Sequence, residues 1–384
     1  MKKLLLFTPG PVNVADNVRA SAVREDICHR EIEFEDLFRS LETRLLKLFE
    51  IRQPKLYQAV VLTGSGSAAN EAMLSSVVGD QNILVLSNGE FGERLHATSK
   101  IHNANTFELK FPWGSALDLA TIDAFLRVHR IDVIAAAHHE TSSGMLNPLA
   151  ALGALAKAHD AILLVDCVSS AGAEAIDMER DNIAFCSASS SKAIGAYPGL
   201  SFVIGKRTEF EKLSFLTPKT GYLNLFKFFE FATQRSQTPN TPAVPLFFAL
   251  DEALSNILIE TVAGRRAKIL RTATRLRTGM TKLGLTFLLD VKDMSSVLTT
   301  VNLPANVDIA QLRKSLRDQS IIIYEGKGPL TGRVFQVGSI GELAKPEVKR
   351  FLRALRDALP AVTLVEPIIR LDPPQMPDSL LASA

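Results

Sequence analysis

Between about residues 57 and 205, short apolar runs alternate with helix-like segments, and this alternation restricts the fold more than any other feature. Six runs are typical of strands: AVVLT (59–63), NILVLS (82–87), TFELKF (106–111), DVIAAAHH (132–139), AILLVDCV (161–168) and LSFVIG (200–205). Several are apolar at every position, as in strands that are covered on both faces. The helices expected between them span 68–78, 117–129 and 148–159. The sequence therefore predicts an α/β fold with a mostly parallel sheet.

The pattern changes after about residue 245. A long helical stretch is followed by shorter apolar segments and another helix: 245–283, GLTFLLD, SSVLTTVNLP, 308–318 and IIIYEG. This order is typical of a smaller α+β domain, and 384 residues exceed what one core usually serves. We therefore predict an N-terminal segment near the functional site (1–20), a large domain (21–250), a small C-terminal domain (251–365) and a loose Pro- and Ser-rich tail (366–384).

The composition argues against several classes of partner. The 43 basic and 41 acidic side chains are spread along the chain, so we expect no nucleic-acid partner. No apolar run approaches the length of a membrane span, which is about 18 residues. The three cysteines, Cys28, Cys167 and Cys186, have neither a disulfide framework nor metal-type spacing. We expect a cytoplasmic protein without a metal, and a structural role for the adjacent pair His138 and His139, which would point to opposite faces of a strand.

A glycine-rich turn follows the first of these strands, at the edge where open α/β sheets bind ligands. Gly64–Ser67 opens a helix, whose free N–H groups and positive dipole suit a phosphate. The letters GSGSAA also fit a loose dinucleotide fingerprint, which requires an acidic residue about 20 positions later. Ser87 and Asn88 end the next strand instead, so a nicotinamide cofactor is disfavoured.

Asp166 and Lys192 are charged residues in apolar surroundings. An ionised carboxylate at the end of an apolar strand is costly unless it is paired. A buried lysine has a lowered pKa and is a good amine for a Schiff base. Taken singly, Asp166 could be a turn residue and Lys192 a solvated loop residue. Together with the glycine-rich turn they describe pyridoxal 5′-phosphate, with its phosphate on the turn, Asp166 at the ring nitrogen and Lys192 on the aldehyde.

A series of motifs in order resembles the class V aminotransferases of fold type I, over about residues 7 to 345: TPGPVNV, TGSGSAANEA, NGEFGER, HHETSSGMLNPL, LLVDCVSS and SSSKAIGAYPG. Within the class, DICHREIEFEDL and HHETSSG are most similar to 2-aminoethylphosphonate–pyruvate transaminases, and next to alanine–glyoxylate and serine–glyoxylate transaminases. The resemblance implies a large cofactor-binding domain with a sheet of the seven-stranded type and a smaller C-terminal domain. It also implies transfer of an amino group from a small amine to an oxo acid such as pyruvate.

The resemblance also implies roles for individual residues. Lys192 matches the Schiff-base lysine and Asp166 the partner of the ring nitrogen. Phe91 matches an aromatic ring that stacks on the cofactor, although plain core packing would also explain it. Ser142 matches a hydroxyl near the 3′ oxygen of the cofactor. The phosphate cradle matches Ser65, Gly66, Ser67 and Ser191, with Thr238 and Thr241 of QTPNTPAVP reaching it from the partner subunit of a homodimer.

One residue departs from the family pattern. Gln336, in RVFQVGSIGEL, stands where acid-binding members commonly carry an arginine that forks onto the substrate carboxylate. Glutamine offers two N–H donors and no charge, a difference of about 1.5–3 kcal/mol, or 10- to 100-fold in binding. Three explanations are open: another cation substitutes for the arginine, the substrate has no acid at that position, or the reaction is not a transamination. The candidate cations are Arg30, His29, Arg333 and Lys327.

Three hypotheses follow from these residues. The leading one is an aminotransferase that uses pyridoxal phosphate, with 2-aminoethylphosphonate and pyruvate as the first substrates to test and with Arg30 and Gln336 as substrate-binding residues. The second keeps the cofactor but makes the protein a lyase or decarboxylase, because Gln336 replaces the arginine. The third is a non-enzymatic binding protein, against which the intact pair Asp166 and Lys192 argues.

Overall fold

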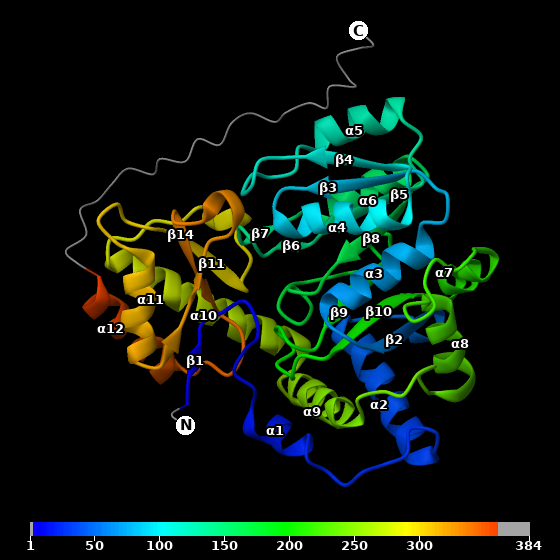
Figure 1. The fold of residues 1–384 in the computed structure, drawn as a ribbon, viewed down its shortest axis with the longest axis horizontal. Coiled ribbons are helices and arrows are strands. Elements are labelled where there is room, and N and C mark those ends of the chain that lie inside the picture. Colours follow the sequence, from blue (N-terminus) through cyan, green and yellow to red (C-terminus); the bar gives the residue numbers. More distant parts are fainter. Residues whose placement is uncertain (1–2, 360–384) are drawn as a thin grey trace.

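The computed structural model describes residues 3–359, and a seven-stranded sheet lies at its centre (Figure 1). In spatial order its strands are β2 (Tyr57–Thr63), β10 (Leu200–Lys206), β9 (Ile183–Ser189), β8 (Ile162–Asp166), β5 (Val133–Ala137), β3 (Ile83–Ser87) and β4 (Thr106–Lys110). Strand β10 is antiparallel to both of its neighbours, and the other pairs are parallel. The predicted α/β fold with a mostly parallel sheet is confirmed.

Helices cover this sheet, which explains why its central strands are apolar at every position. Helix α3 packs against β9, α4 against β3, α6 against β8 and α8 against β2. The helices in this part are α1 (Asp16–Ser21), α2 (Ile32–Leu48), α3 (Gly66–Val77), α4 (Glu90–His102), α5 (Leu119–Val128), α6 (Leu149–Ala158), α7 (Arg207–Lys212), α8 (Leu225–Arg235) and α9 (Val244–Glu260).

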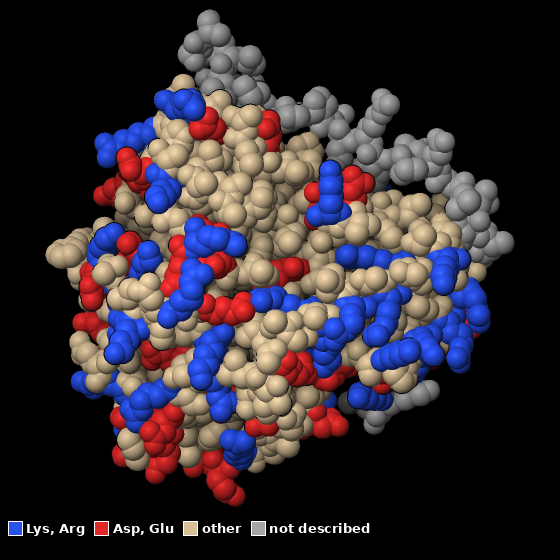
Figure 2. All heavy atoms as spheres, turned by 180° about the vertical axis from the view of Figure 1, so that it is seen from behind, with Lys and Arg blue, Asp and Glu red and all other residues tan. Residues whose placement is uncertain are grey.

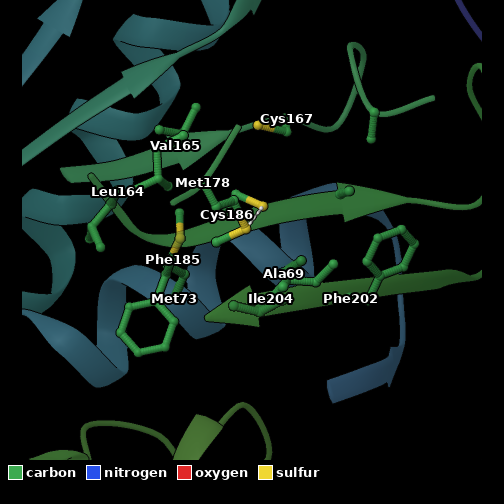
Figure 3. Close-up of a cluster of buried hydrophobic side chains, with 14 of the residues drawn as sticks. Ala69, Met73, Leu164, Val165, Cys167, Met178, Phe185, Cys186, Phe202 and Ile204 are labelled. Atoms are coloured by element: carbon green, nitrogen blue, oxygen red, sulfur yellow. Dashed lines mark hydrogen bonds between the residues drawn. The ribbon is translucent and has the colours of Figure 1, made fainter. Parts of the chain in front are cut away.

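Strand β9 is not among the six predicted strands, although it lies between β8 and β10. Its sequence IAFCSAS mixes small and hydroxyl side chains, so its apolar character is weak, yet all seven residues are buried. Figure 3 shows Phe185 and Cys186 of this strand among buried side chains of the neighbouring elements. The Cys186 thiol lies 3.6 Å from the sulfur of Met178. The strand ends at Ser189, three residues before Lys192, and therefore fixes the start of the turn that carries this lysine.

A second hydrophobic cluster surrounds a three-stranded sheet in the order β11-β14-β13. Its elements are α10 (Val262–Lys282), β11 (Leu298–Asn302), α11 (Ile309–Asp318), β13 (Tyr324–Glu325), β14 (Val334–Gly338) and α12 (Lys345–Ala358). The expected 245–283 helix is two helices, because Thr261 adopts a φ of 64° between α9 and α10. The predicted domain bounds stay predictions, and residues 360–384, with the predicted tail, lie outside the described residues.

The N-terminal segment packs on this second part. Strand β1 (Leu5–Leu6) pairs in parallel with β12 (Ile321–Ile322), and the ring of Phe7 stacks 4.4 Å from that of Phe351. The segment then crosses toward the large sheet (Figure 1). The segment from Leu5 to Val18 therefore links the two hydrophobic clusters.

Basic side chains gather on the side of the molecule where α10 and α12 lie (Figure 2). Exposed members of this group are Arg271, Arg275, Lys282, Lys349 and Arg353. The sequence did not indicate this gathering, because the two helices are far apart along the chain. Within residues 3–359, no helix is both long and apolar enough to cross a membrane.

Candidate active site

Lys192 and Asp166 lie at the same edge of the seven-stranded sheet. Asp166 is the last residue of β8, and Lys192 lies in the turn between β9 and β10. Because β10 returns antiparallel, this turn stands at the carboxyl end of β8 and β9, where such sheets bind ligands. The negative charge of Asp166 acts on Lys192, so the two groups are electrostatically coupled.

The surroundings of Lys192 favour the uncharged form of its amine. Burial lowers its pKa; Asp166 opposes this shift, while the positive charges of Lys327 and Arg94 add to it. A lowered pKa leaves a larger fraction of the amine unprotonated near neutral pH. Gly10 packs against the same side chain, since a Cβ on Gly10 would lie 2.5 Å from the lysine Nζ.

Asp166 is buried, and two donors support its carboxylate. Asn70 Nδ2 donates to Oδ2 at 2.7 Å, and the backbone N–H of Val168 donates to Oδ1 at 2.8 Å. Burial raises the pKa of Asp166, and these two hydrogen bonds lower it. Asn70 also accepts a hydrogen bond from Ser187 Oγ in β9. Sequence reasoning missed Asn70, which lies 96 residues from Asp166 in the chain.

A cavity of about 60 Å³ opens in front of Asp166. Its lining comprises Gly66, Ser67, Asn70, Phe91, Arg94, Leu95, Thr98, Asp166 and Val168. Gly66 begins helix α3, whose first N–H groups have no partner within the helix. A Cβ on Gly66 would lie 2.6 Å from Val168 Cγ1, so only glycine leaves this end of the cavity open. Four of the predicted site residues, Gly66, Ser67, Phe91 and Asp166, are thus brought together.

Ser142 belongs to the turn between β6 (His139–Glu140) and β7 (Met145–Leu146). Its hydroxyl donates to Glu140 Oε1 at 2.5 Å and accepts from the backbone N–H of Glu90 at 3.0 Å. The Glu140 carboxylate also accepts from the N–H groups of Phe91 and Gly92, at 3.1 and 3.0 Å. Burial raises the pKa of Glu140, and its hydrogen bonds lower it. Glu140, which sequence reasoning missed, therefore caps the start of α4 and fixes Phe91.

Gln336 reaches the same turn from the three-stranded sheet. It is buried in β14, and its Nε2 donates to the carbonyl oxygens of Thr141 and Ser142, each at 2.9 Å. Both amide hydrogens therefore bond to the main chain in this structure. The turn that carries Ser142 is held by Gln336 on one side and by α4 on the other.

Arg30 and Thr238 form a separate group. Arg30 Nη1 donates to the Thr238 carbonyl at 2.7 Å and to Gln237 Oε1 at 3.0 Å. The Thr238 hydroxyl is buried and donates to the Asn240 carbonyl, whereas Thr241 is exposed. The cavity lining contains none of these residues.

The two remaining predicted phosphate ligands lie near the turn and the helix start. Ser191 Oγ lies 3.0 Å from Ser189 Oγ, one residue before Lys192. Ser65 is the exposed N-cap residue of α3, and its side chain makes no capping hydrogen bond. Arg94 Nη2 donates to Ser67 Oγ at 3.0 Å, a contact at the same end of the cavity that sequence reasoning did not find.

His138 and His139 are buried and bond to serine hydroxyls. Nδ1 of His138 lies 3.0 Å from Ser170 Oγ, and Nε2 of His139 lies 2.9 Å from Ser295 Oγ. Burial lowers the pKa of His138 to about 4 and that of His139 to about 3. The part of the chain that the structure describes holds no group of three or more His, Cys, Asp or Glu that could bind a metal ion.

Comparison with known proteins places this geometry in a family. The family model for aminotransferase class V matches residues 15–337. The chain belongs to the class V aminotransferases. The predicted family is therefore confirmed, and this class V aminotransferase depends on pyridoxal 5′-phosphate.

Two relatives and one solved structure illustrate the likeness. The chain is 30% identical to a 2-aminoethylphosphonate–pyruvate transaminase of Vibrio vulnificus, over 92% of this chain and 97% of that protein. It is 28% identical to a pyridoxamine–pyruvate transaminase of Mesorhizobium japonicum, over 89% and 88% of the two chains. The crystal structure of an alanine–glyoxylate aminotransferase from Nostoc superposes with a TM-score of 0.88 at 27% identity, over 93% and 96% of the two chains.

The residues around the cavity of this aminotransferase fit the cofactor. Asp166 is a buried carboxylate without a direct cation partner among the described residues, which a protonated ring nitrogen would supply. Phe91 and Val168 are apolar lining residues suited to the faces of a flat ring. The open start of α3 at Gly66 suits a phosphate. Lys192 has the lowered pKa that capture of an aldehyde requires.

Proposed function

We propose that this aminotransferase moves an amino group from 2-aminoethylphosphonate, or a small amine like it, to an oxo acid such as pyruvate. One observation supports this choice of substrate: the 2-aminoethylphosphonate–pyruvate transaminase of Vibrio vulnificus matches the chain over 97% of its own length. The electrostatic coupling of Lys192 to Asp166, which lines the cavity, supports the reaction type. The balance is one amine and one oxo acid consumed, and one aldehyde and one amino acid formed.

Lys192 and Asp166 divide the proton chemistry. The bound cofactor supplies an electron-withdrawing ring that weakens the Cα–H bond of the substrate. With the cofactor bound, Lys192 Nζ would act as the general base that takes the proton from the substrate Cα and then as the general acid that returns it. Its lowered pKa favours the unprotonated form of this amine. Asp166 would favour the protonated ring nitrogen through its negative charge.

The other residues bind and orient. Phe91 and Val168, which line the cavity, would pack on the faces of the ring. Ser142, whose hydroxyl Glu140 fixes beside the start of α4, would contact the 3′ oxygen. The phosphate is bound by Ser65, Gly66, Ser67 and Ser191.

The active site is completed by a second copy of the chain. Arg30, Thr238 and Thr241 lie outside the cavity lining of their own chain. Their placement supports a homodimer in which Thr238 and Thr241 reach the cofactor phosphate of the partner, and Arg30 the partner's substrate. The cytoplasmic location stays a prediction.

The reaction is tested with purified protein that has been loaded with pyridoxal phosphate. Addition of 2-aminoethylphosphonate should convert the absorbance of the aldehyde form to that of the amine form, and pyruvate should restore it with release of alanine. K192A is the control and should show neither change. Cleavage of an amine without any oxo acid, with no donor converting the cofactor, would contradict transamination.

A further inference from the structure

Gln336 is not available to an acid in this structure. Its two amide hydrogens bond to the carbonyl oxygens of Thr141 and Ser142. A phosphonate or carboxylate at this place would meet two acceptor oxygens and no free donor of the glutamine. An acidic substrate therefore needs a cation elsewhere around Lys192.

Two cations act on Lys192 in the described part of the chain, and both lie over Phe91. Arg94 Cζ is 5.4 Å and Lys327 Nζ is 5.7 Å from the centre of the Phe91 ring. Arg94 bonds to Ser67 at the start of α3, the end of the cavity that suits a phosphate. Lys327 comes instead from the loop between β13 and β14, and β14 is the strand that carries Gln336. Of the two, Lys327 is the cation on the side of the second hydrophobic cluster.

Lys327 is held loosely by Glu90. Nζ lies 3.1 Å from Oε2 without hydrogen-bond geometry, and its hydrogen bond to Oε1 is long, at 3.4 Å. The lysine side chain is 47% exposed, so it has room to turn toward a ligand. Glu90 also lies 4.0 Å from Arg94, so the trio of two cations and one carboxylate keeps a net positive charge.

We propose that Lys327 binds the acidic group of the substrate in place of the arginine that Gln336 replaces. The inference rests on the proposed amino transfer, and it names a substrate class: a small amine that carries a phosphonate. An arginine fork matches the plane of a carboxylate, whereas an ammonium is a compact point charge without that planar preference. A tetrahedral dianion gains more from such a charge than a planar monoanion does.

The test compares K327M with the wild-type holoenzyme. The dissociation constant of ethylphosphonate, which has no amine to transfer, should rise about 10- to 100-fold in K327M, and K327R should restore most of the affinity. The KM for 2-aminoethylphosphonate should rise by a similar factor with a smaller change in kcat. The KM for butylamine, which has no acid, should stay unchanged.

The matched control is R313M. Arg313 is 48% exposed and pairs with Glu325 at 3.5 Å, close along the chain to Lys327. It should leave ethylphosphonate binding unchanged. The inference is overturned if ethylphosphonate fails to bind the wild type, or binds K327M as tightly. Should 2-aminoethylphosphonate fail to convert the cofactor, the proposed function fails, and ethylphosphonate binding still decides the role of Lys327.

Discussion

Gly10 lies directly against Lys192: a Cβ on Gly10 would stand 2.5 Å from both Cδ and Nζ of the lysine. The φ of Gly10 is 136°, a backbone region that other residues avoid at a cost of about 1–3 kcal/mol. The amine end of a flexible side chain can move aside, so G10A should displace the amine more than it disturbs folding. We expect the half-reaction rate to fall about 100-fold, measured by single-turnover absorbance.

The control for this variant is G332A. Gly332 has a φ of 70° and no atom within 4 Å of the built Cβ, so it tests backbone strain alone. G332A should lose stability without a comparable loss of rate. An equal loss of rate in both variants would contradict the contact.

Gln336 should matter for stability. Q336A leaves the carbonyls of Thr141 and Ser142 without their donor, which costs about 1–3 kcal/mol for buried groups. Q336E should be worse, because an ionised carboxylate would face the same two oxygens. The free energy of unfolding from urea titration measures both, with Q311A at the exposed Gln311 as the control. Equal stability of Q336E and wild type would show that the two hydrogen bonds contribute nothing.

The pKa of Lys192 should move in opposite directions in two variants. Lys327 helps to lower this pKa, so K327M should raise it and leave less free amine at a given pH. Asp166 raises the same pKa, so D166N should lower it and leave more free amine. The pH midpoint for labelling of Lys192 in the apoenzyme by an amine-reactive reagent, read by mass spectrometry, should shift up in K327M and down in D166N. Shifts of the same sign would refute the assignment.

Mixed dimers test whether Thr241 acts in the partner's site. K192A should be inactive, and T241D should fail to hold the phosphate. In a mixed dimer, one of the two sites would combine an intact Lys192 with an intact Thr241. Random co-assembly of the two inactive chains should therefore restore about a quarter of the wild-type activity. Heterodimers without recovered activity would place Thr241 outside the partner's site.

The fold and the centre of the site could be predicted from the sequence, because charged residues and glycines that follow apolar strands meet at one sheet edge. Asp166, Phe91 and Gly66 do surround one cavity. Strand β9 was missed since its small and hydroxyl residues resemble a loop until neighbouring strands bury them. The break at Thr261 was missed because neither glycine nor proline marks it.

The supporting contacts could not be predicted, since they join side chains that are distant in the chain. Asn70 reaches Asp166 across 96 residues, and Gln336 reaches Thr141 across 195. Glu140 could have been suspected from HHETSSG, but its role depends on where the start of α4 falls. Such roles follow from side-chain directions that only the folded chain defines.

Lys192 and Lys327 stand in parts of the fold that differ in how readily they accept substitutions. Lys192 is anchored between β9 and β10, whose residues are almost all buried, so neighbouring substitutions would disturb the core. Lys327 stands on an exposed loop that tolerates exchange. Substitutions in that loop can therefore change the substrate specificity of a descendant of this protein, while the reactive amine of Lys192 keeps its position.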